Sequence, residues 1–201
     1  MSDRVTIVAV TAPTPAVFLD RDGTLIEEAG YLDDIARLAL FPSTVDALRM
    51  LARAQYRLVV LTNQSGIALG LFDEPFVRQT HEALDVRLDA AGARIDGWYF
   101  CPHHPAGQVP ALTRVCTCRK PAPALAQQAA VDLDIDLARS WMVGDRWGDV
   151  GVAATAGMAG GILVRTGYGR SAEARPMAGV TAAFVADDIM DAASWILRQG
   201  R

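Results

Sequence analysis

A short apolar run that ends in two aspartates constrains the fold of this chain more than any other feature. Residues 17–19 are Val-Phe-Leu, and Asp20, Asp22 and Gly23 follow directly. Such a run is typical of a strand buried on both faces of a parallel sheet. Open α/β sheets bind ligands at the carboxyl ends of their strands, and side chains two residues apart in an extended chain point the same way. The sequence therefore predicts that Asp20 and Asp22 converge on a reactive site.

Two converging carboxylates repel each other unless a cation lies between them. Mg²⁺ suits such a site because it prefers a few carboxylates, carbonyls and waters. With the cation bound, one carboxylate can attack an electrophile while the other, protonated, donates a proton to the leaving oxygen. Taken alone, the motif also fits a solvated turn or a calcium loop, so the rest of the chain has to decide.

Apolar runs and helix-like segments alternate along the chain. Strands are expected at residues 17–19, 56–61, 98–101, 141–143, 161–164 and 183–186. Helices are expected from Ser43, at 73–92, at 123–133, at 150–157 and at 189–197, with Ser43 and Asp188 as caps. The alternation predicts an α/β protein with a Rossmann-like, doubly wound parallel sheet. The segments between the strands are too short for a separate cap domain, so the site should be open.

Composition and charge limit the classes of partner. The chain has 201 residues, of which 51% are hydrophobic and 21% charged, and this fits one soluble domain over residues 1–201. The net charge of −4 and the lack of a Lys/Arg run argue against a nucleic-acid-binding face, and no apolar stretch approaches the length of a membrane span. Residues 1–15 are interpreted as a flexible leader rather than a secretion signal, because their apolar segment is short.

Candidate chemical groups stand at four expected strand ends. They are Asp20 with Asp22, Thr62 with Asn63, Arg119 with Lys120, and Asp145 with Asp149. Each pair alone could merely end a strand or open a helix. Their joint appearance at successive strand ends indicates a phosphoryl-transfer site. Asp149 would accept a hydrogen bond near that site or serve only as an acid at a helix N-terminus.

The residue types suggest a role for each side chain. Asp20 would attack phosphorus and form an aspartyl phosphate, while Asp22 would protonate the leaving alcohol and then deprotonate the attacking water. Asp145 would complete the Mg²⁺ shell together with Asp20 and the backbone carbonyl of Asp22. Thr62 and Lys120 would bind the transferring phosphoryl oxygens.

This pattern resembles the haloacid dehalogenase (HAD) superfamily of phosphohydrolases over about residues 16–165. The matching motifs, in order, are residues 20–24 (Asp-Arg-Asp-Gly-Thr), Thr62, Lys120 and Gly144-Asp145 to Asp149. The second aspartate, Asp22, is what the phosphatases of the superfamily carry and its dehalogenases lack. The resemblance implies a HAD-like fold and an aspartyl-phosphate mechanism.

The three cysteines form a second ligand set. Cys101, Cys116 and Cys118, with His103 or His104, supply three thiolates and one imidazole, a tetrahedral zinc set. The alternative is three buried structural cysteines beside an incidental histidine. An odd, clustered set is not a disulfide framework, and it favours a reducing compartment such as the cytoplasm. Four protein ligands leave no position for water, so the zinc would be structural and would order the loop 101–118.

A zinc loop of this kind resembles a smaller group that includes the D-glycero-D-manno-heptose 1,7-bisphosphate phosphatases and the histidinol-phosphatases. The resemblance places the zinc ligand at His103. The segments around Gly30-Tyr31, 62–66, 101–105 and 118–121 are similar to the heptose enzymes, whereas histidinol-phosphatases typically have Asp at position 65 and a shorter zinc loop. The implied substrate-binding residues are Glu28, Ala29, Gly30, Tyr31, Thr62, Asn63, Gln64, Ser65, Arg119, Lys120 and Arg146.

Among these residues, Arg119 would bind a second phosphate and Arg146 would face the substrate. The chain departs from the heptose enzymes at Glu28-Ala29, where they tend to have Asp-His. Trp147, beside the predicted metal ligand Asp145, would pack under the site or contact the substrate.

The sequence thus predicts a Mg²⁺-dependent phosphatase with a structural Zn²⁺, acting on a small phosphorylated metabolite. The expected substrate is heptose 1,7-bisphosphate, cleaved at the C7 phosphate, and the expected state is a monomer. Histidinol phosphate or another sugar phosphate is the alternative substrate. A non-catalytic zinc-loop binding protein is disfavoured because the catalytic set, Asp20 and Lys120 included, is intact.

Overall fold

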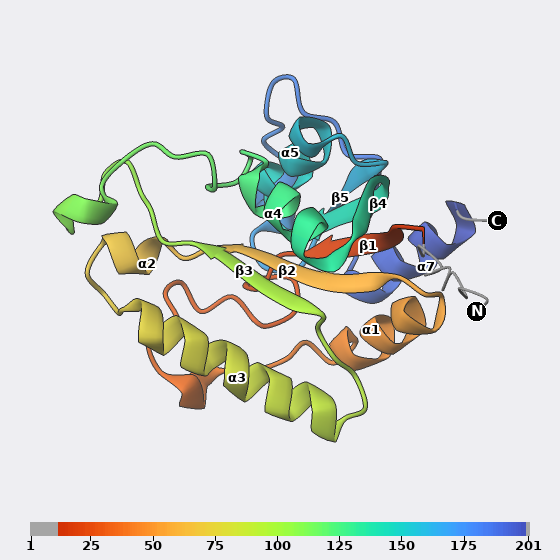
Figure 1. Ribbon diagram of the computed structural model, residues 1–201, viewed down its shortest axis with the longest axis horizontal. Coiled ribbons are helices and arrows are strands. Elements are labelled where there is room, and N and C mark those ends of the chain that lie inside the picture. The colour runs from red at the N-terminus through yellow and green to blue at the C-terminus, as the bar shows by residue number, and fades with distance from the viewer. Residues whose placement is uncertain (1–11, 200–201) are drawn as a thin grey trace, which may run out of the picture.

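Six parallel strands form the centre of the molecule (Figure 1). The computed structural model describes residues 12–199, and its strands run in the order β3-β2-β1-β4-β5-β6. Their bounds are β1 Thr14–Leu19, β2 Arg57–Asn63, β3 Gly97–Cys101, β4 Ile135–Gly144, β5 Gly160–Val164 and β6 Phe184–Ala186. This order confirms the predicted doubly wound sheet, and the direction of winding reverses between β1 and β4. Ligands of such sheets bind at that reversal.

Helices cover both faces of the sheet (Figure 1). On one face lie α1 (Thr44–Arg53), α3 (Glu74–Ala90) and α7 (Ile189–Gln199). On the other lie α4 (Ala124–Leu133) and α5 (Trp147–Ala156). The shorter elements are α2 (Ser65–Ala68), α6 (Gly169–Glu173) and the 3₁₀ turns η1 (Ile35–Arg37) and η2 (Pro110–Leu112).

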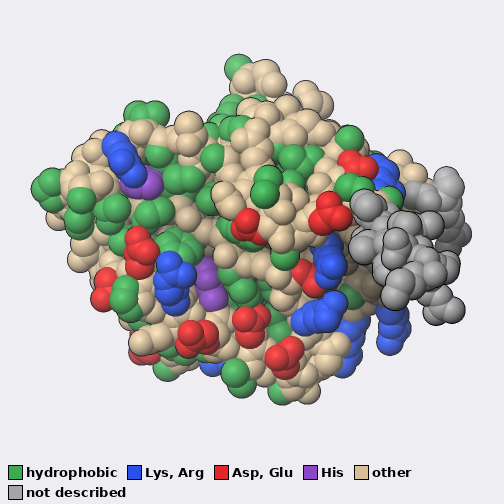
Figure 2. Space-filling view, in the orientation of Figure 1, with side chains coloured by type: hydrophobic (Ala, Val, Ile, Leu, Met, Phe, Trp, Pro, Cys, Tyr) green, Lys and Arg blue, Asp and Glu red, His purple; other side chains and the backbone are tan. Residues whose placement is uncertain are grey.

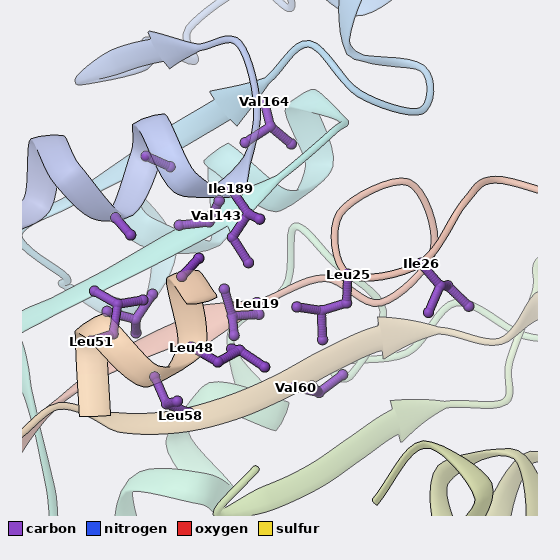
Figure 3. Close-up of a cluster of buried hydrophobic side chains, with 14 of the residues drawn as sticks. Leu19, Leu25, Ile26, Leu48, Leu51, Leu58, Val60, Val143, Val164 and Ile189 are labelled. Carbon is purple, nitrogen blue, oxygen red and sulfur yellow. The ribbon is translucent and has the colours of Figure 1, made fainter. Parts of the chain in front are cut away.

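The central strands are anchored by an apolar layer on each face. In β1, Val17 and Leu19 belong to the cluster shared with α1 and α7, whereas Ala16 and Phe18 belong to the cluster under α4 and α5. Figure 3 shows Leu19 beside Leu48 of α1, with Ile189 of α7 above it. Burial of a large aliphatic side chain contributes about 1.5–3 kcal/mol. The strand end that carries Asp20 is therefore held in place from both sides.

Several element boundaries differ from the predictions for identifiable reasons. Helix α5 begins at Trp147, three residues early, because the Asp149 carboxylate accepts the backbone N–H of Arg146 at 2.9 Å and so caps the first turn. The Ser43 hydroxyl does not cap α1 but donates to Asp188 Oδ2 at 2.8 Å. Asp188 caps α7 as expected, accepting from Asp191 N at 3.0 Å.

The start of the chain is described only from residue 12. Strand β1 begins at Thr14, so the last two residues of the predicted leader belong to the sheet. The rest of that interpretation, on residues 1–11, lies outside the described residues. Within residues 12–199 the connections carry short helices and turns and no separate cap domain, as predicted.

Surface and helix properties bear on the partner predictions. None of the helices described here is both long and apolar enough to cross a membrane. Acidic and basic side chains are interspersed on the face shown in Figure 2, which does not present a single basic patch.

Candidate active site

Three buried carboxylates meet where the sheet reverses direction. Asp20 follows β1, Asp145 follows β4, and Asp149 lies in the first turn of α5, with exposed fractions of 7%, 0% and 2%. One carboxylate oxygen from each lies within 4.8 Å of the others. The cluster brings together the predicted nucleophile and the predicted metal ligand Asp145, and it adds Asp149.

Lys120 is the counterion of this cluster. Its Nζ lies 2.8 Å from Asp20 Oδ1 and 2.6 Å from Asp149 Oδ1, and it donates to the carbonyl of Leu61 at 2.7 Å. Burial lowers the pKa of Lys120, but Asp149 and Asp20 more than offset this and leave it above the usual value. The lysine therefore stays charged. Asp149 serves as both an N-terminal helix acid and the second partner of Lys120.

The pKa values of the other two carboxyls reflect their crowding. Burial raises the pKa of Asp20 to about 7 against the opposing charge of Lys120. Burial, followed by the charges of Asp20 and Asp149, raises the pKa of Asp145 to about 8. One lysine does not neutralise three carboxylates, so the cluster favours a further cation.

The surroundings of Asp145 fit a hard divalent cation. Asp145 Oδ2 accepts the backbone N–H of Tyr168 at 2.7 Å, whereas the buried Oδ1 has no hydrogen-bond partner among residues 12–199. A Cβ atom at Gly23 or at Gly167 would lie only 2.3 Å from Asp145 Oδ2, and both residues have positive φ. The two glycines therefore let the chain close around a carboxylate that has one oxygen left for a metal.

Asp22 lies apart from the three carboxylates and is held by Arg21. The guanidinium contacts it through Nε and Nη2, at 3.0 Å each. Gln64 directly follows β2, and its Nε2 lies 3.1 Å from Asp22 Oδ2 and 2.8 Å from Thr62 Oγ1. The sequence did not indicate a role for Arg21, because a basic residue inside an Asp-x-Asp motif is expected to be solvent-exposed. In the structure its side chain is buried, with only 2% exposed.

A cavity of about 350 Å³ opens above these groups. Both Asp20 and Asp22 line it, as do all the predicted substrate-binding residues except Ala29. The Ala29 side chain packs against the core, and its carbonyl accepts from Arg37, so Ala29 does not line this cavity. The cavity also has wall residues that the sequence did not suggest for substrate binding, namely Arg21, Leu32, Gly66, Phe72, His104, Asp149 and Tyr168.

Two arginines lie at the cavity mouth, and each is held by different contacts. Arg119 donates to Ser65 Oγ at 2.8 Å and to the carbonyl of His103 at 3.3 Å. The guanidinium of Arg146 lies 3.9 Å from the Tyr168 ring centre and 3.9 Å from Glu28 Oε2. The predicted pair thus places two cationic groups around the opening.

Asn63 joins the end of β2 to the lysine segment. Its Oδ1 accepts Lys120 N at 3.0 Å, and its Nδ2 donates to the Lys120 carbonyl at 3.3 Å. Trp147 lies outside the main cavity wall and donates to the carbonyl of Ala172 at 2.7 Å. Trp147 therefore packs beside the site and ties α5 to α6.

The cysteines and His103 form a second cluster, within 4.8 Å of one another. Cys118 Sγ lies 3.1 Å from Cys101 Sγ, 3.3 Å from Cys116 Sγ and 3.2 Å from His103 Nδ1. Thiolates at about 2.3 Å from a tetrahedral zinc lie about 3.8 Å apart, so the set fits one metal with small adjustments. With Nδ1 on a metal, His103 Nε2 carries the proton, and the exposed Arg114, now 2.7 Å from it, must turn aside.

The chain is similar to named phosphatases over most of its length. A family model described as HAD-hydrolase-like matches residues 117–192. The D-glycero-beta-D-manno-heptose-1,7-bisphosphate 7-phosphatase of Yersinia pestis is 43% identical over 164 residues, 82% of this chain and 87% of the relative. The enzyme of that name from Haemophilus ducreyi is 46% identical over 159 residues, 79% of this chain and 87% of the relative. The chain belongs to this phosphatase family.

A solved structure agrees with the sequence comparison. The D,D-heptose 1,7-bisphosphate phosphatase of B. bronchiseptica, solved with magnesium and phosphate, has a TM-score of 0.80 and 32% identity. The match covers 92% of this chain and 99% of that protein. The HAD-like fold and the phosphatase family expected from the sequence are therefore confirmed.

Proposed function

We propose that the protein removes the C7 phosphate of D-glycero-β-D-manno-heptose 1,7-bisphosphate in a Mg²⁺-dependent reaction. The observation that carries the proposal is a cavity with Lys120 and Asp20 at its base and two arginines at its mouth. Lys120 would bind the phosphoryl group to be transferred, and Arg119 the phosphate at the other end of the sugar. The names of the relatives support the β anomer.

Asp20 is the proposed nucleophile. Its Oδ1 accepts from Arg21 N and from Lys120 at 2.8 Å each, and Oδ2 takes part in neither bond. In the first step Oδ2 forms a bond to phosphorus while the bond to the sugar oxygen breaks, giving an aspartyl phosphate. In the second step a water oxygen bonds to phosphorus and the Asp20–phosphorus bond breaks, which releases phosphate.

Asp22 is the proposed acid and base of these two steps. Protonated, it gives its proton to the leaving sugar oxygen, and it then takes a proton from the attacking water. Mg²⁺, held by Asp20, Asp145 and the Asp22 carbonyl, would offset the carboxylate charge and screen the phosphoryl oxygens. Thr62 and Lys120 would orient those oxygens.

Glu28 bears on the choice between a bisphosphate and histidinol phosphate. A carboxylate at the cavity wall would suit the amine of histidinol phosphate, which heptose bisphosphate lacks. However, Glu28 Oε1 accepts Gly30 N at 2.7 Å and Oε2 faces Arg146 at 3.9 Å. Glu28 is therefore occupied by these groups and not free to bind an amine. Because it helps to hold Arg146 at the cavity mouth, where a phosphate can bind, it favours the bisphosphate as substrate.

We also propose that the cysteine cluster holds a structural Zn²⁺. The support is the thiol and imidazole spacing and the bond from Arg119 to the carbonyl of the proposed ligand His103. Through that bond the zinc loop would help to place the arginine for the second phosphate. Partly exposed thiolate ligands need a reducing compartment, so we expect a cytoplasmic enzyme. Its open, self-contained site would function in a monomer.

Phosphate release tests the proposal. Purified enzyme with Mg²⁺ is given each anomer of heptose 1,7-bisphosphate and, separately, histidinol phosphate, with Asp20→Asn as the control. We expect rapid release from the β anomer and none from the variant. Faster release from histidinol phosphate would contradict the substrate, and release by Asp20→Asn would contradict the site.

A further inference from the structure

One buried histidine outside the predicted site contacts the machinery around Asp22. His81 lies in the middle of α3 and is 5% exposed. Its ring stacks on Trp98 of β3, with centroids 4.5 Å apart and planes 17° apart. Trp98 in turn donates through Nε1 to Asp85, at 2.9 Å and 3.1 Å from its two oxygens. The ring is therefore fixed in position and orientation.

The ring edge that carries Nε2 faces Arg21. His81 Nε2 lies 3.4 Å from Arg21 Nη1. A guanidinium has only donors, so the histidine nitrogen must be the acceptor, and the ring proton is then on Nδ1. Burial, followed by the charge of Arg21, lowers the pKa of His81 to about 3, which agrees with a neutral ring.

The guanidinium of Arg21 is held by three different residues. Nε and Nη2 contact Asp22 at 3.0 Å, Nη2 also reaches Gln64 Oε1 at 3.1 Å, and Nη1 points to His81. Without His81, Nη1 would be a buried donor with no partner at this position. This costs free energy and would favour rotation of the guanidinium. Because Asp22 is bound to the guanidinium, its carboxylate would then be displaced.

We propose that His81 is a positioning residue of the phosphatase, which accepts from Arg21 Nη1 and so holds the guanidinium that orients the Asp22 carboxyl. The proposal rests on the acid–base role given to Asp22 above. His81 itself lies outside the cavity wall and does not touch the substrate. It acts on the proton transfer through Arg21 alone.

The test compares leaving groups, because a purely structural role would not distinguish them. His81→Phe keeps an aromatic ring against Trp98 but removes the acceptor, and His81→Gln restores a side-chain carbonyl. Thr80→Val is the matched control, since Thr80 is also buried on α3 and its hydroxyl donates within the helix to Phe76 O. The two substrates are heptose 1,7-bisphosphate, whose leaving oxygen needs a proton, and p-nitrophenyl phosphate, whose leaving group departs without one.

We expect His81→Phe to lower kcat/KM about tenfold for the sugar phosphate, a fraction of what general acid catalysis contributes. The fall for p-nitrophenyl phosphate should be several times smaller, KM for the sugar should stay near the wild-type value, and His81→Gln should recover part of the loss. Equal falls for both leaving groups, or the same ratio in Thr80→Val, would overturn the proposal. Any alkyl phosphate that the enzyme hydrolyses can replace the heptose, so a wrong substrate assignment would be seen separately in the wild-type rates.

A second measurement does not depend on turnover or on a variant that folds. In ¹⁵N spectra of the wild-type protein, the His81 ring should carry its proton on Nδ1 between about pH 6 and 8. A ring proton on Nε2 would contradict the acceptor role directly, because Nε2 could not then accept from Arg21.

Discussion

The two ligand clusters of this protein are assembled in opposite ways. The three carboxylates are all buried, and they come from the ends of β1 and β4 and the first turn of α5. In the thiol cluster only Cys101, at the end of β3, and His103 are buried; the other two ligands lie partly exposed in a loop whose regular structure is one 3₁₀ turn. The sheet thus builds the first site before any metal binds, whereas in the second site the metal would fix the loop.

The same contrast extends to the charges. Asp20 and Asp149 already share Lys120, and Asp145 is bound by the Tyr168 N–H, so the first site is set in place by protein contacts. The thiols contact mainly one another. Changes in the first cluster should therefore affect chemistry with little change of fold, and changes in the second should affect local order first.

The largest expected effect is that of Asp20→Asn. Removing the nucleophile should lower kcat by roughly 10³-fold or more. The fold should persist, because the amide has the same shape and its oxygen can still accept from Arg21 N and Lys120. Circular dichroism and phosphate release measure both properties. Turnover by the variant at a rate comparable with that of the wild type would show that Asp20 is not the nucleophile.

Lys120→Met tests the counterion. Loss of the charge that binds the phosphoryl oxygens should lower kcat/KM by about 10²-fold. It should also lower the melting temperature at pH 8, because Asp20 and Asp149 lose their shared partner. Kinetics and thermal melting check the two effects, and Lys120→Arg, which keeps the charge, is the control. An unchanged melting temperature would contradict the role of Lys120 in holding the cluster together.

Cys116→Ser tests the second cluster. Loss of one thiolate should reduce zinc content, loosen the loop 101–118 and lower kcat/KM about tenfold through Arg119. The loss should be larger for the bisphosphate than for a monophosphate, since Arg119 is proposed to bind the second phosphate. Elemental analysis gives the zinc content, and Thr117→Ser is the neighbouring control. Full zinc occupancy in Cys116→Ser would contradict the ligand assignment.

The carboxylate cluster should also give the protein a pH dependence of stability that the thiol cluster does not. The pKa values of Asp20 and Asp145 are raised to about 7 and about 8. His81, with its pKa lowered to about 3, opposes them only below about pH 6.5, so between about pH 6.5 and 8 the folded protein binds more protons than the unfolded chain. Stability of the Mg²⁺-free protein should therefore fall as pH rises through this window. Saturating Mg²⁺ should reduce the slope, because it stabilises the ionised carboxylates. A melting temperature that rises with pH in the absence of Mg²⁺ would contradict the raised pKa values of Asp20 and Asp145.

The sequence predicts the parts of this molecule that follow a local pattern. The apolar run before Asp20 and the alternation of strands and helices lead to the observed sheet, and spacing alone brings the cysteines together with a histidine. Helix α5 begins earlier than its apolar stripe predicts because the Asp149 carboxylate accepts the backbone N–H of Arg146 and caps the first turn. Ser43 precedes α1 as predicted, but its hydroxyl does not cap that helix because it donates to Asp188, 145 residues away.

Long-range contacts also explain the site residues that sequence analysis missed. His81 lies on the buried stripe of α3, and nothing in the local sequence distinguishes it from other helical residues. Its role depends on contacts with β3 and Arg21, which form only in the folded protein. Tyr168 becomes part of the cavity only because β5 ends beside β4, which brings its N–H to Asp145 and its ring to Arg146. Such residues carry no local pattern, and only the folded chain identifies them.

Trapping the covalent intermediate tests whether Asp20 is the nucleophile. Enzyme mixed with Mg²⁺ and β-heptose 1,7-bisphosphate is quenched in acid within a single turnover, and its peptides are examined by mass spectrometry. We expect a phosphoryl group on the peptide that contains Asp20. This group should be absent from the Asp20→Asn variant and should be lost from the wild type on longer incubation. A phosphoryl group on another residue, or none while phosphate is released in a burst, would contradict this role of Asp20.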